Sequence, residues 1–192
     1  MNRRGRRNIL SKAVLYAVLI LVTACKSADT YRDPKMDFGS IYTVAVMPLT
    51  NLSKEQVASD RVRDVLVTML LATGDVYVIP PGEVARGVVL AGVPNPSAPS
   101  NDETKKLGTV LKADALITGV VREYGEMRSG TAVANVLSLH LQMTEVQTGR
   151  VVWSVSSTKG GISFLDRLFG GGGEPMNDIT EKTVKDVINK LF

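Results

Sequence analysis

The sequence predicts an α/β domain in which a mixed sheet packs against helices. Three observations support this fold class. Short β-branched runs at 41–47, 76–79 and 115–121 are separated by stretches of helical periodicity. Two strands with alternating polarity follow, at 131–146 and 150–157, and the chain ends in an amphipathic helix. The expected order is β-α-β-α-α-β-β-β-α, a single αβ sandwich with a mixed sheet of about five strands and helices on one face.

Local signals mark the helix ends. The first helix has apolar residues at helical spacing from Val62 to Leu70, and Gly74 closes it. A short second helix is expected at 83–90. The starts of the first, third and last helices carry the pattern of a capping box, in which the side chains of two residues three positions apart each accept a hydrogen bond from the other's backbone N–H group. The pairs are Ser53 with Gln56, Ser100 with Glu103, and Asp178 with Glu181.

The two long strands are expected to form a hairpin with one buried face. On the first strand the apolar face consists of Val133, Leu137, Leu139, Leu141 and Met143, and the polar face of Ser138, His140, Gln142 and Thr144. On the second, Val151, Trp153 and Val155 alternate with smaller residues. This pattern favours a core position for Trp153, with a contact to a partner protein as the alternative.

The N-terminus resembles a bacterial lipoprotein signal. Basic residues precede an uncharged apolar stretch at 13–24, which is too short for a membrane span of about 20 residues. Val22 to Cys25 resembles a lipobox, and the resemblance implies that Cys25, the only cysteine, is acylated. An ordinary signal peptide with an incidental cysteine is the alternative. The expected division is 1–24 signal peptide, 25–38 lipidated cysteine and polar tether, and 39–192 periplasmic α/β domain.

Charge and composition narrow the function classes. Residues 1–24 hold five basic and no acidic residues, so 18 basic residues stand against 19 acidic ones in the remainder. This balance gives no reason to expect nucleic-acid binding. One histidine and one cysteine do not make a zinc site of the usual kind, and the glycines near the C-terminus lack the Lys-Ser/Thr of a P-loop. We therefore expect no metal, no cofactor and no enzyme activity.

Three segments carry a family resemblance: VAVMPLTNLS at 44–53, KADALITGVV at 112–121 and MTEVQTGRVVWS at 143–154. Together they resemble the envelope lipoproteins related to the curli-secretion protein (CsgG type), the penicillin-binding-protein activator (LpoB type) and the N-terminal domain of TolB. A related lipoprotein serves exopolysaccharide export. The resemblance implies a shared fold over 41–192 and a role in the cell envelope. Lys26 after the cysteine resembles the sorting pattern of outer-membrane lipoproteins.

Two differences between this sequence and these relatives make some of the possible functions less expected than others. A pore of the curli type is not expected, because a lipid-facing strand needs an apolar exterior and the long hairpin has a polar face. A tether of about 12 residues spans roughly 40 Å, which is short for reaching an inner-membrane enzyme from the outer membrane. The first expectation is a non-catalytic, lipid-anchored outer-membrane accessory for assembly, secretion or export, acting through envelope-protein contacts and as a possible homo-oligomer. The alternatives are a regulator of a cell-wall synthase, and a small-ligand receptor or enzyme.

A glycine-flanked apolar segment lies at 160–175 and reads GGISFLDRLFGGGGEP. Its apolar side chains recur at helical spacing, which suits a short amphipathic helix. The helix is expected either to pack on the core of its own domain or, through the flanking glycines, to reach a neighbouring subunit, a partner or the bilayer. For the second case the candidate interface residues are Phe164, Leu165, Leu168 and Phe169, together with Trp153.

Overall fold

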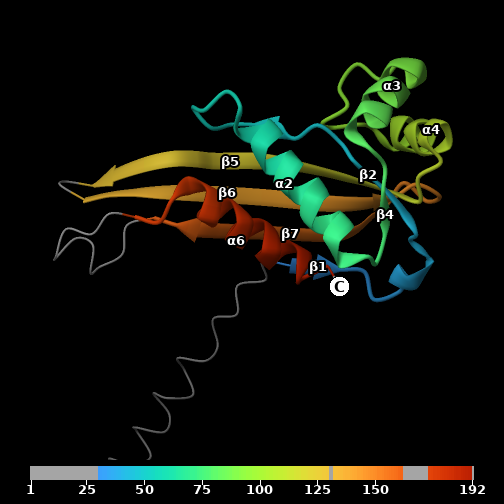
Figure 1. The fold of residues 1–192 in the computed structure, drawn as a ribbon. Helices are drawn as coiled ribbons and strands as arrows, with labels where there is room; N and C mark the ends of the chain where they lie inside the picture. Colours follow the sequence, from blue (N-terminus) through green and yellow to red (C-terminus); the bar gives the residue numbers. More distant parts are fainter. Residues whose placement is uncertain (1–29, 130–131, 162–172, 192) are drawn as a thin grey trace, which may run out of the picture.

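A computed structural model describes residues 30–129, 132–161 and 173–191 of the chain. Within them, one open mixed sheet has the strand order β1-β7-β6-β5-β2-β4, with β3 also paired to β5 (Figure 1). The strands are β1 (Thr30–Arg32), β2 (Thr43–Val46), β3 (Thr50–Asn51), β4 (Tyr77–Val78), β5 (Ala115–Ser129), β6 (Ala132–Glu145) and β7 (Val151–Gly160). β5, β6 and β7 form an antiparallel meander, while β2, β3 and β4 run parallel to their neighbours. The α/β fold class is confirmed.

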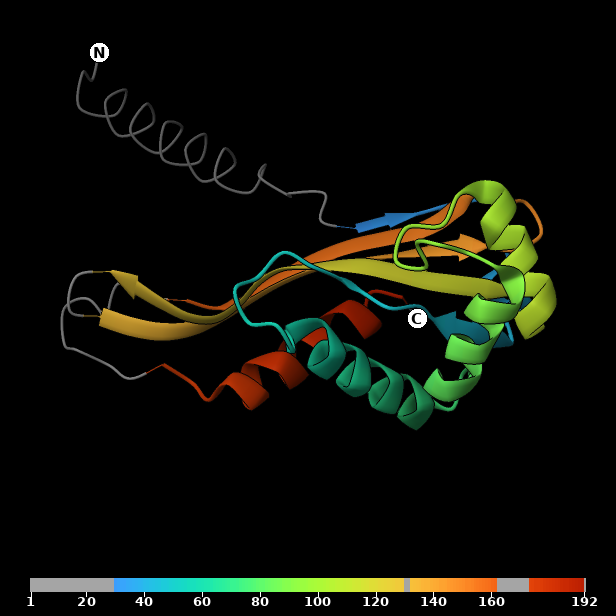
Figure 2. The same ribbon diagram turned by 90° about the horizontal axis from the view of Figure 1, so that it is seen from above.

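Helices lie on both faces of the sheet, which corrects the expectation of one covered face. They are α2 (Ala58–Thr73), α3 (Pro81–Ala91), α4 (Asn101–Leu111) and α6 (Met176–Ile188), with a 3₁₀ turn η1 at Phe38–Ser40. Figure 2 shows α2 and α6 beneath the sheet and α3 and α4 at its end. Side chains of β2 alternate between the layers: Val44 and Val46 face α2 and α6, whereas Ala45 and Met47 join the cluster of α3 and α4. A strand that is apolar on both faces requires a cover on each.

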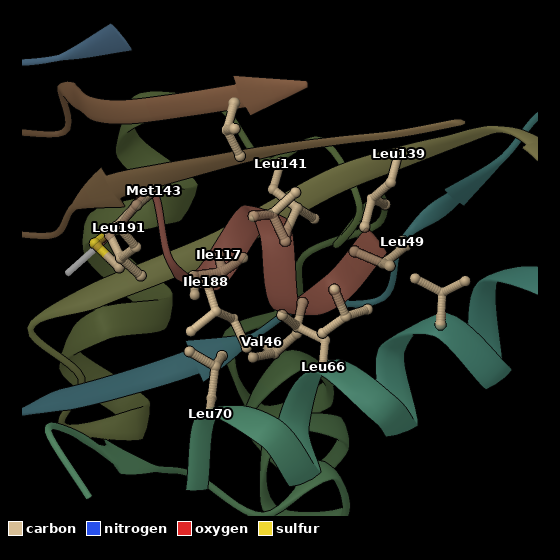
Figure 3. Packing of buried hydrophobic residues seen from close by; sticks show 14 of the residues in the cluster. Val46, Leu49, Leu66, Leu70, Ile117, Leu139, Leu141, Met143, Ile188 and Leu191 are labelled. Carbon is tan, nitrogen blue, oxygen red and sulfur yellow. The ribbon is translucent and has the colours of Figure 1, made fainter. Parts of the chain in front are cut away.

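The main core lies between the meander and the helix pair α2 and α6. Leu66 and Leu70 of α2 and Ile188 of α6 meet Leu139 and Leu141 of β6 (Figure 3). Each of these five side chains is at least nine-tenths buried. Burial of a leucine-sized side chain contributes about 1.5–3 kcal/mol relative to leaving it in water, so this layer supplies much of the driving force for folding.

The polar segment assigned to the tether contributes an edge strand. β1 pairs antiparallel with β7, placing Thr30 opposite Val155. Asp33 follows it: its N–H donates to the Val152 carbonyl at 2.8 Å and its carboxylate lies 3.6 Å from Arg150. The folded part of the chain thus includes residues from Thr30, nine positions before the expected boundary at residue 39. The side chains of β1 are exposed, which is why the local sequence can be polar. Backbone pairing holds the strand, together with a hydrogen bond from the Arg32 guanidinium to the Leu191 carbonyl and the stacking of that guanidinium over the Phe38 ring.

The hairpin of β6 and β7 has the predicted polarity on β6 but not throughout β7. Leu137, Leu139, Leu141 and Met143 are buried, as expected. On β7, Trp153 opposes Met143 while Val151 opposes Thr144, so Val152 is an extra residue in a β-bulge. The bulge turns Val152 into the core and leaves Val151 exposed, which corrects the simple alternation predicted for Val151.

One of the three predicted capping boxes is confirmed. Ser100 caps α4: its Oγ accepts from the Glu103 N–H, and the Glu103 carboxylate accepts from the Ser100 N–H at 2.7 Å. The box at Ser53 is wrong, because its hydroxyl donates to Asn51 in the loop before α2. The box at Asp178 is also wrong, since α6 begins at Met176, directly after a proline, and Asp178 falls in its first turn.

The helices of the described residues are too short or too polar to cross a membrane.

Candidate functional site: the uncovered face of the sheet

The meander leaves much of one face without a helix among the described residues. α3 and α4 cover this face only at the end near β2, and the remainder carries half-exposed polar side chains. From β6 come Ser138, His140, Gln142 and Thr144, with Thr118 from β5 and Ser156 from β7. The strand period of two places all of them on the face opposite the core. His140 lies with Ser138 and Gln142 on a polar surface, as the sequence predicted.

A hydrogen-bonded chain fixes the imidazole of His140. Its Nδ1 lies 3.0 Å from the Ser156 hydroxyl and its Nε2 lies 3.0 Å from the Gln142 amide nitrogen. Because that amide nitrogen donates, the Nε2 of His140 accepts and the proton resides on Nδ1. Burial lowers the pKa of His140, and the positive charge of Arg122 lowers it further, against an opposing backbone hydrogen bond at Val155. The ring is therefore neutral at neutral pH.

A groove of about 290 Å³ opens beside this imidazole, between the sheet and the segment that leads into α4. Its roof is Ser97, Ala98, Pro99 and Asn101. The walls and floor are Thr50, Thr104, Leu116, Thr118, Gly119, Val120, His140, Gln142, Thr144, Gly149 and Val151. Every side chain in this lining is uncharged at neutral pH.

The roof is held by local hydrogen bonds. The capping box at Ser100 fixes the entry into α4, and the Ser97 hydroxyl donates to the Asn95 side chain at 2.8 Å. The hydrogen bond from the Ser100 N–H holds the pKa of Glu103 below its ordinary value, so the cap is ionised and intact at neutral pH. The groove consequently has a defined wall on each side.

A second surface feature is apolar and lies on α3. The side chains of Val89 and Leu90 are 79% and 77% exposed, and Ala85, one turn earlier than Val89, is exposed as well. Arg86 is the one charged residue beside them on this stretch of helix. Sequence reasoning predicted this helix but missed its exposed apolar face. Helical periodicity shows which residues share a face, and the face toward the sheet here is formed by Val84, Gly87 and Ala91.

The sequence-predicted site residues fall into two groups. Cys25 and four interface candidates, Phe164, Leu165, Leu168 and Phe169, lie outside the described residues. Trp153 lies in the core, 1% exposed, and its indole N–H donates to the Lys190 carbonyl at 3.0 Å. Trp153 therefore offers no surface to a partner in this structure, in line with the core position that its strand pattern favoured.

Among residues 30–129, 132–161 and 173–191, the His, Asp and Glu side chains do not gather into a metal-binding cluster.

Fold and surface define the class of this protein: a small α/β domain whose exposed features are a polar sheet face, a shallow groove and an apolar helix face. Comparison with known families places the chain within that class. The sequence pattern of the peptidoglycan-synthase activator LpoB family matches residues 27–158, more than half of the chain. The chain belongs to this family. The resemblance to LpoB-type envelope lipoproteins is thereby confirmed.

Solved structures extend the fold comparison. The PelC dodecamer from Paraburkholderia phytofirmans is 16% identical, with a TM-score of 0.55 over 84% of this chain and 94% of that one. Lipoprotein GNA1162 from Neisseria meningitidis is 19% identical, with a TM-score of 0.56 over 78% and 97% of the two chains. The hypothetical protein CT253 from Chlamydia trachomatis is 11% identical, with a TM-score of 0.52 over 79% and 96%. At these identities the likeness concerns the fold. No curated protein matches the chain.

Proposed function

We propose that this protein is a non-catalytic, lipid-anchored envelope protein that regulates a peptidoglycan synthase by direct contact. The observation that carries the proposal is the family match over 27–158, which runs from the residues before β1 into β7. The match supports the cell-wall-synthase regulator, the alternative in the sequence analysis, more than the export accessory that was the first expectation.

The surface proposed for this contact is the apolar face of α3. Val89 and Leu90 expose large aliphatic side chains in adjacent positions, next to the exposed Ala85. Burying apolar area against a partner stabilises a complex by about 25 cal/mol per Å² before the costs of association are subtracted. Interfaces are depleted of charged residues at their centre, and between Ala85 and Leu90 the only charged residue is Arg86, with Glu83 in the first turn of α3.

The double substitution Val89→Ser with Leu90→Ser tests this surface. We expect weaker binding of the organism's own peptidoglycan synthases and a smaller stimulation of glycan polymerisation, because the apolar contact is lost. Both positions are exposed, so the free energy of unfolding changes by no more than about 1 kcal/mol. The measurements are co-purification and polymerisation rate with the full-length protein in detergent.

Leu71→Ser, at an exposed leucine of α2 outside the proposed surface, is the matched control and is expected to bind normally. If the wild-type protein neither binds nor stimulates any of these synthases, the regulator proposal fails. If the wild-type protein binds and stimulates a synthase and the double variant does so equally well, the regulator proposal stands and the α3 surface is excluded.

Membrane attachment through Cys25 is the second part of the proposal. Because Thr30 already belongs to the sheet, the five residues that follow Cys25, up to Thr30, can span at most about 17 Å, and an acylated Cys25 would hold the domain against its membrane. Cys25→Ser is expected to abolish incorporation of a labelled fatty acid and to move the protein from the membrane to the soluble fraction. Unchanged labelling and fractionation would exclude acylation at Cys25.

The short linker also favours a second candidate, an assembly or export accessory that works at the membrane surface. The PelC structure, which has this fold, is a dodecamer. Light scattering on the full-length protein in detergent separates the candidates. A stable ring-sized particle without synthase binding supports the accessory, whereas a monomer that binds a synthase supports the regulator.

A further inference from the structure

The groove beside His140 has a lining whose chemistry is uniform. Its polar groups are hydroxyls, amides and one neutral imidazole, contributed by Thr50, Ser97, Asn101, Thr104, Thr118, His140, Gln142 and Thr144. Each of these side-chain types both donates and accepts hydrogen bonds. The lining has neither a basic group to balance an anion nor a carboxylate to balance a cation. The matching ligand is therefore uncharged and itself carries groups that donate and accept.

Several of these groups are available to a ligand. The hydroxyls of Thr118 and Thr144 make no side-chain hydrogen bond to the described residues, although both line the groove. The imidazole of His140 is held in place from both sides by Ser156 and Gln142, so its orientation is set before a ligand arrives. Polar groups fixed in advance cost less entropy on binding than mobile ones.

The groove also has apolar residues. Val120 of β5 lies opposite His140 and Val151 of β7 lies opposite Thr144, so the two valines stand at opposite ends of the polar row, and Pro99 lies on the roof. Val151 reaches this position only because the bulge at Val152 turns it out of the core. A ligand with both hydroxyl groups and a face of C–H bonds fits such a lining, and sugar rings have this dual character.

The size of the groove limits the ligand. About 290 Å³ lies just below the range of about 300–1,000 Å³ that is usual for small-molecule sites. The groove is partly open to solvent, so one ring can sit inside while the rest of a longer chain extends out of it.

We propose that this groove binds one unit of a neutral, hydroxyl-rich glycan, with Gln142, Thr118 and Thr144 as hydrogen-bonding residues and Val151, next to Thr144, as the apolar contact. The site lies on the meander face, and its sugar binding does not depend on the contact proposed for α3.

Ligand-detected saturation-transfer NMR on the full-length protein, in a detergent without a sugar head group, tests the proposal. The probes are N-acetylglucosamine and its β-1,4-linked disaccharide. We expect transfer to both, with a tighter dissociation constant for the disaccharide. Inorganic phosphate and a blocked neutral tripeptide serve as competitors and are expected to leave the signal unchanged.

Gln142→Ala and Thr118→Val each remove hydrogen-bonding capacity from the groove and are expected to weaken binding about tenfold. Thr118→Val keeps the side-chain shape, so it remains informative if Gln142→Ala unfolds. Ser138→Ala, on the same face but outside the lining, is the matched control and is expected to bind as the wild type does. Absence of transfer to both sugars overturns the proposal. Displacement by the tripeptide or phosphate, or unaltered binding by Thr118→Val, overturns it as well.

Discussion

The two faces of β6 belong to the same strand but have opposite fates. On one face Leu137, Leu139 and Leu141 are almost completely buried beneath α2 and α6. On the other, His140 and Gln142 alternate with them and remain half-exposed. The two faces of one strand therefore contribute differently. The face covered by helices stabilises the fold through packing, and the exposed face offers hydrogen-bonding groups.

The faces also differ in how closely their helices approach. α2 and α6 contact the sheet through long aliphatic side chains, whereas a glycine of α3 allows the close contact with α4, and a glycine of α4 allows its close approach to the end of β6. A Cβ at Gly87 would overlap the Leu111 side chain, and one at Gly108 would overlap Val146. The packing of α3 and α4 thus requires two positions without a side chain, whereas the packing of α2 and α6 on the sheet relies on large apolar side chains.

The largest expected effect comes from removing side-chain volume on the closed face. Leu139→Ala leaves a cavity at a fully buried position and is expected to lower the free energy of unfolding by about 2–5 kcal/mol. Urea unfolding followed by circular dichroism measures it. Ser138→Ala, the adjacent residue on the open face, is the control and should change stability by no more than about 1 kcal/mol. Equal losses for the two variants would contradict the division between the faces.

A smaller effect is expected from adding a methyl group under α4. Gly108→Ala brings a Cβ within 2.8 Å of the Val146 Cβ and is expected to destabilise by about 1–3 kcal/mol despite the better helix propensity of alanine. Gly82→Ala in α3 is the matched control, because no atom lies near its added methyl group. It should be neutral or stabilise by up to about 1 kcal/mol. Thermal unfolding of both variants measures the contrast, and stabilisation by Gly108→Ala would show that α4 has room to shift.

Local sequence signals predicted the elements that depend on local physics. Gly74 ends α2 in the left-handed conformation, and Ser100 with Glu103 starts α4, as expected. The pairs at Ser53 and Asp178 match the same pattern but do not cap. Near Ser53 the Asn51 side chain organises the loop, and Pro175 lets α6 begin before Asp178. The capping-box pattern considers only two residues three positions apart, so it cannot show that a neighbouring side chain or proline determines where the helix begins.

Features that depend on distant pairing were missed. β1 pairs with residues more than 120 positions away, and its own three residues have no strand pattern. The groove likewise joins the roof before α4 to β5 and β6, so the sequence predicted His140 on a polar face but not the wall opposite it. The bulge at Val152 changes the face of Val151 without any glycine or proline to mark it.

Pairing of β1 with β7 fixes where the sheet begins, and so it would set the length of the proposed membrane tether that starts at Cys25. While β1 is paired, a domain anchored at Cys25 samples only a thin layer next to its membrane. β1 is held by three backbone-paired residues and by the contacts of Arg32 with the Leu191 carbonyl and the Phe38 ring, a small set of interactions that can open locally while the rest of the sheet remains folded. Detachment up to Ile41, the first buried apolar residue, would extend the linker to about 50 Å. The search volume would then grow and the local concentration at nearby partners would fall. In the proposed lipid-anchored form, the contacts that hold β1 would therefore set how far from the membrane the domain reaches.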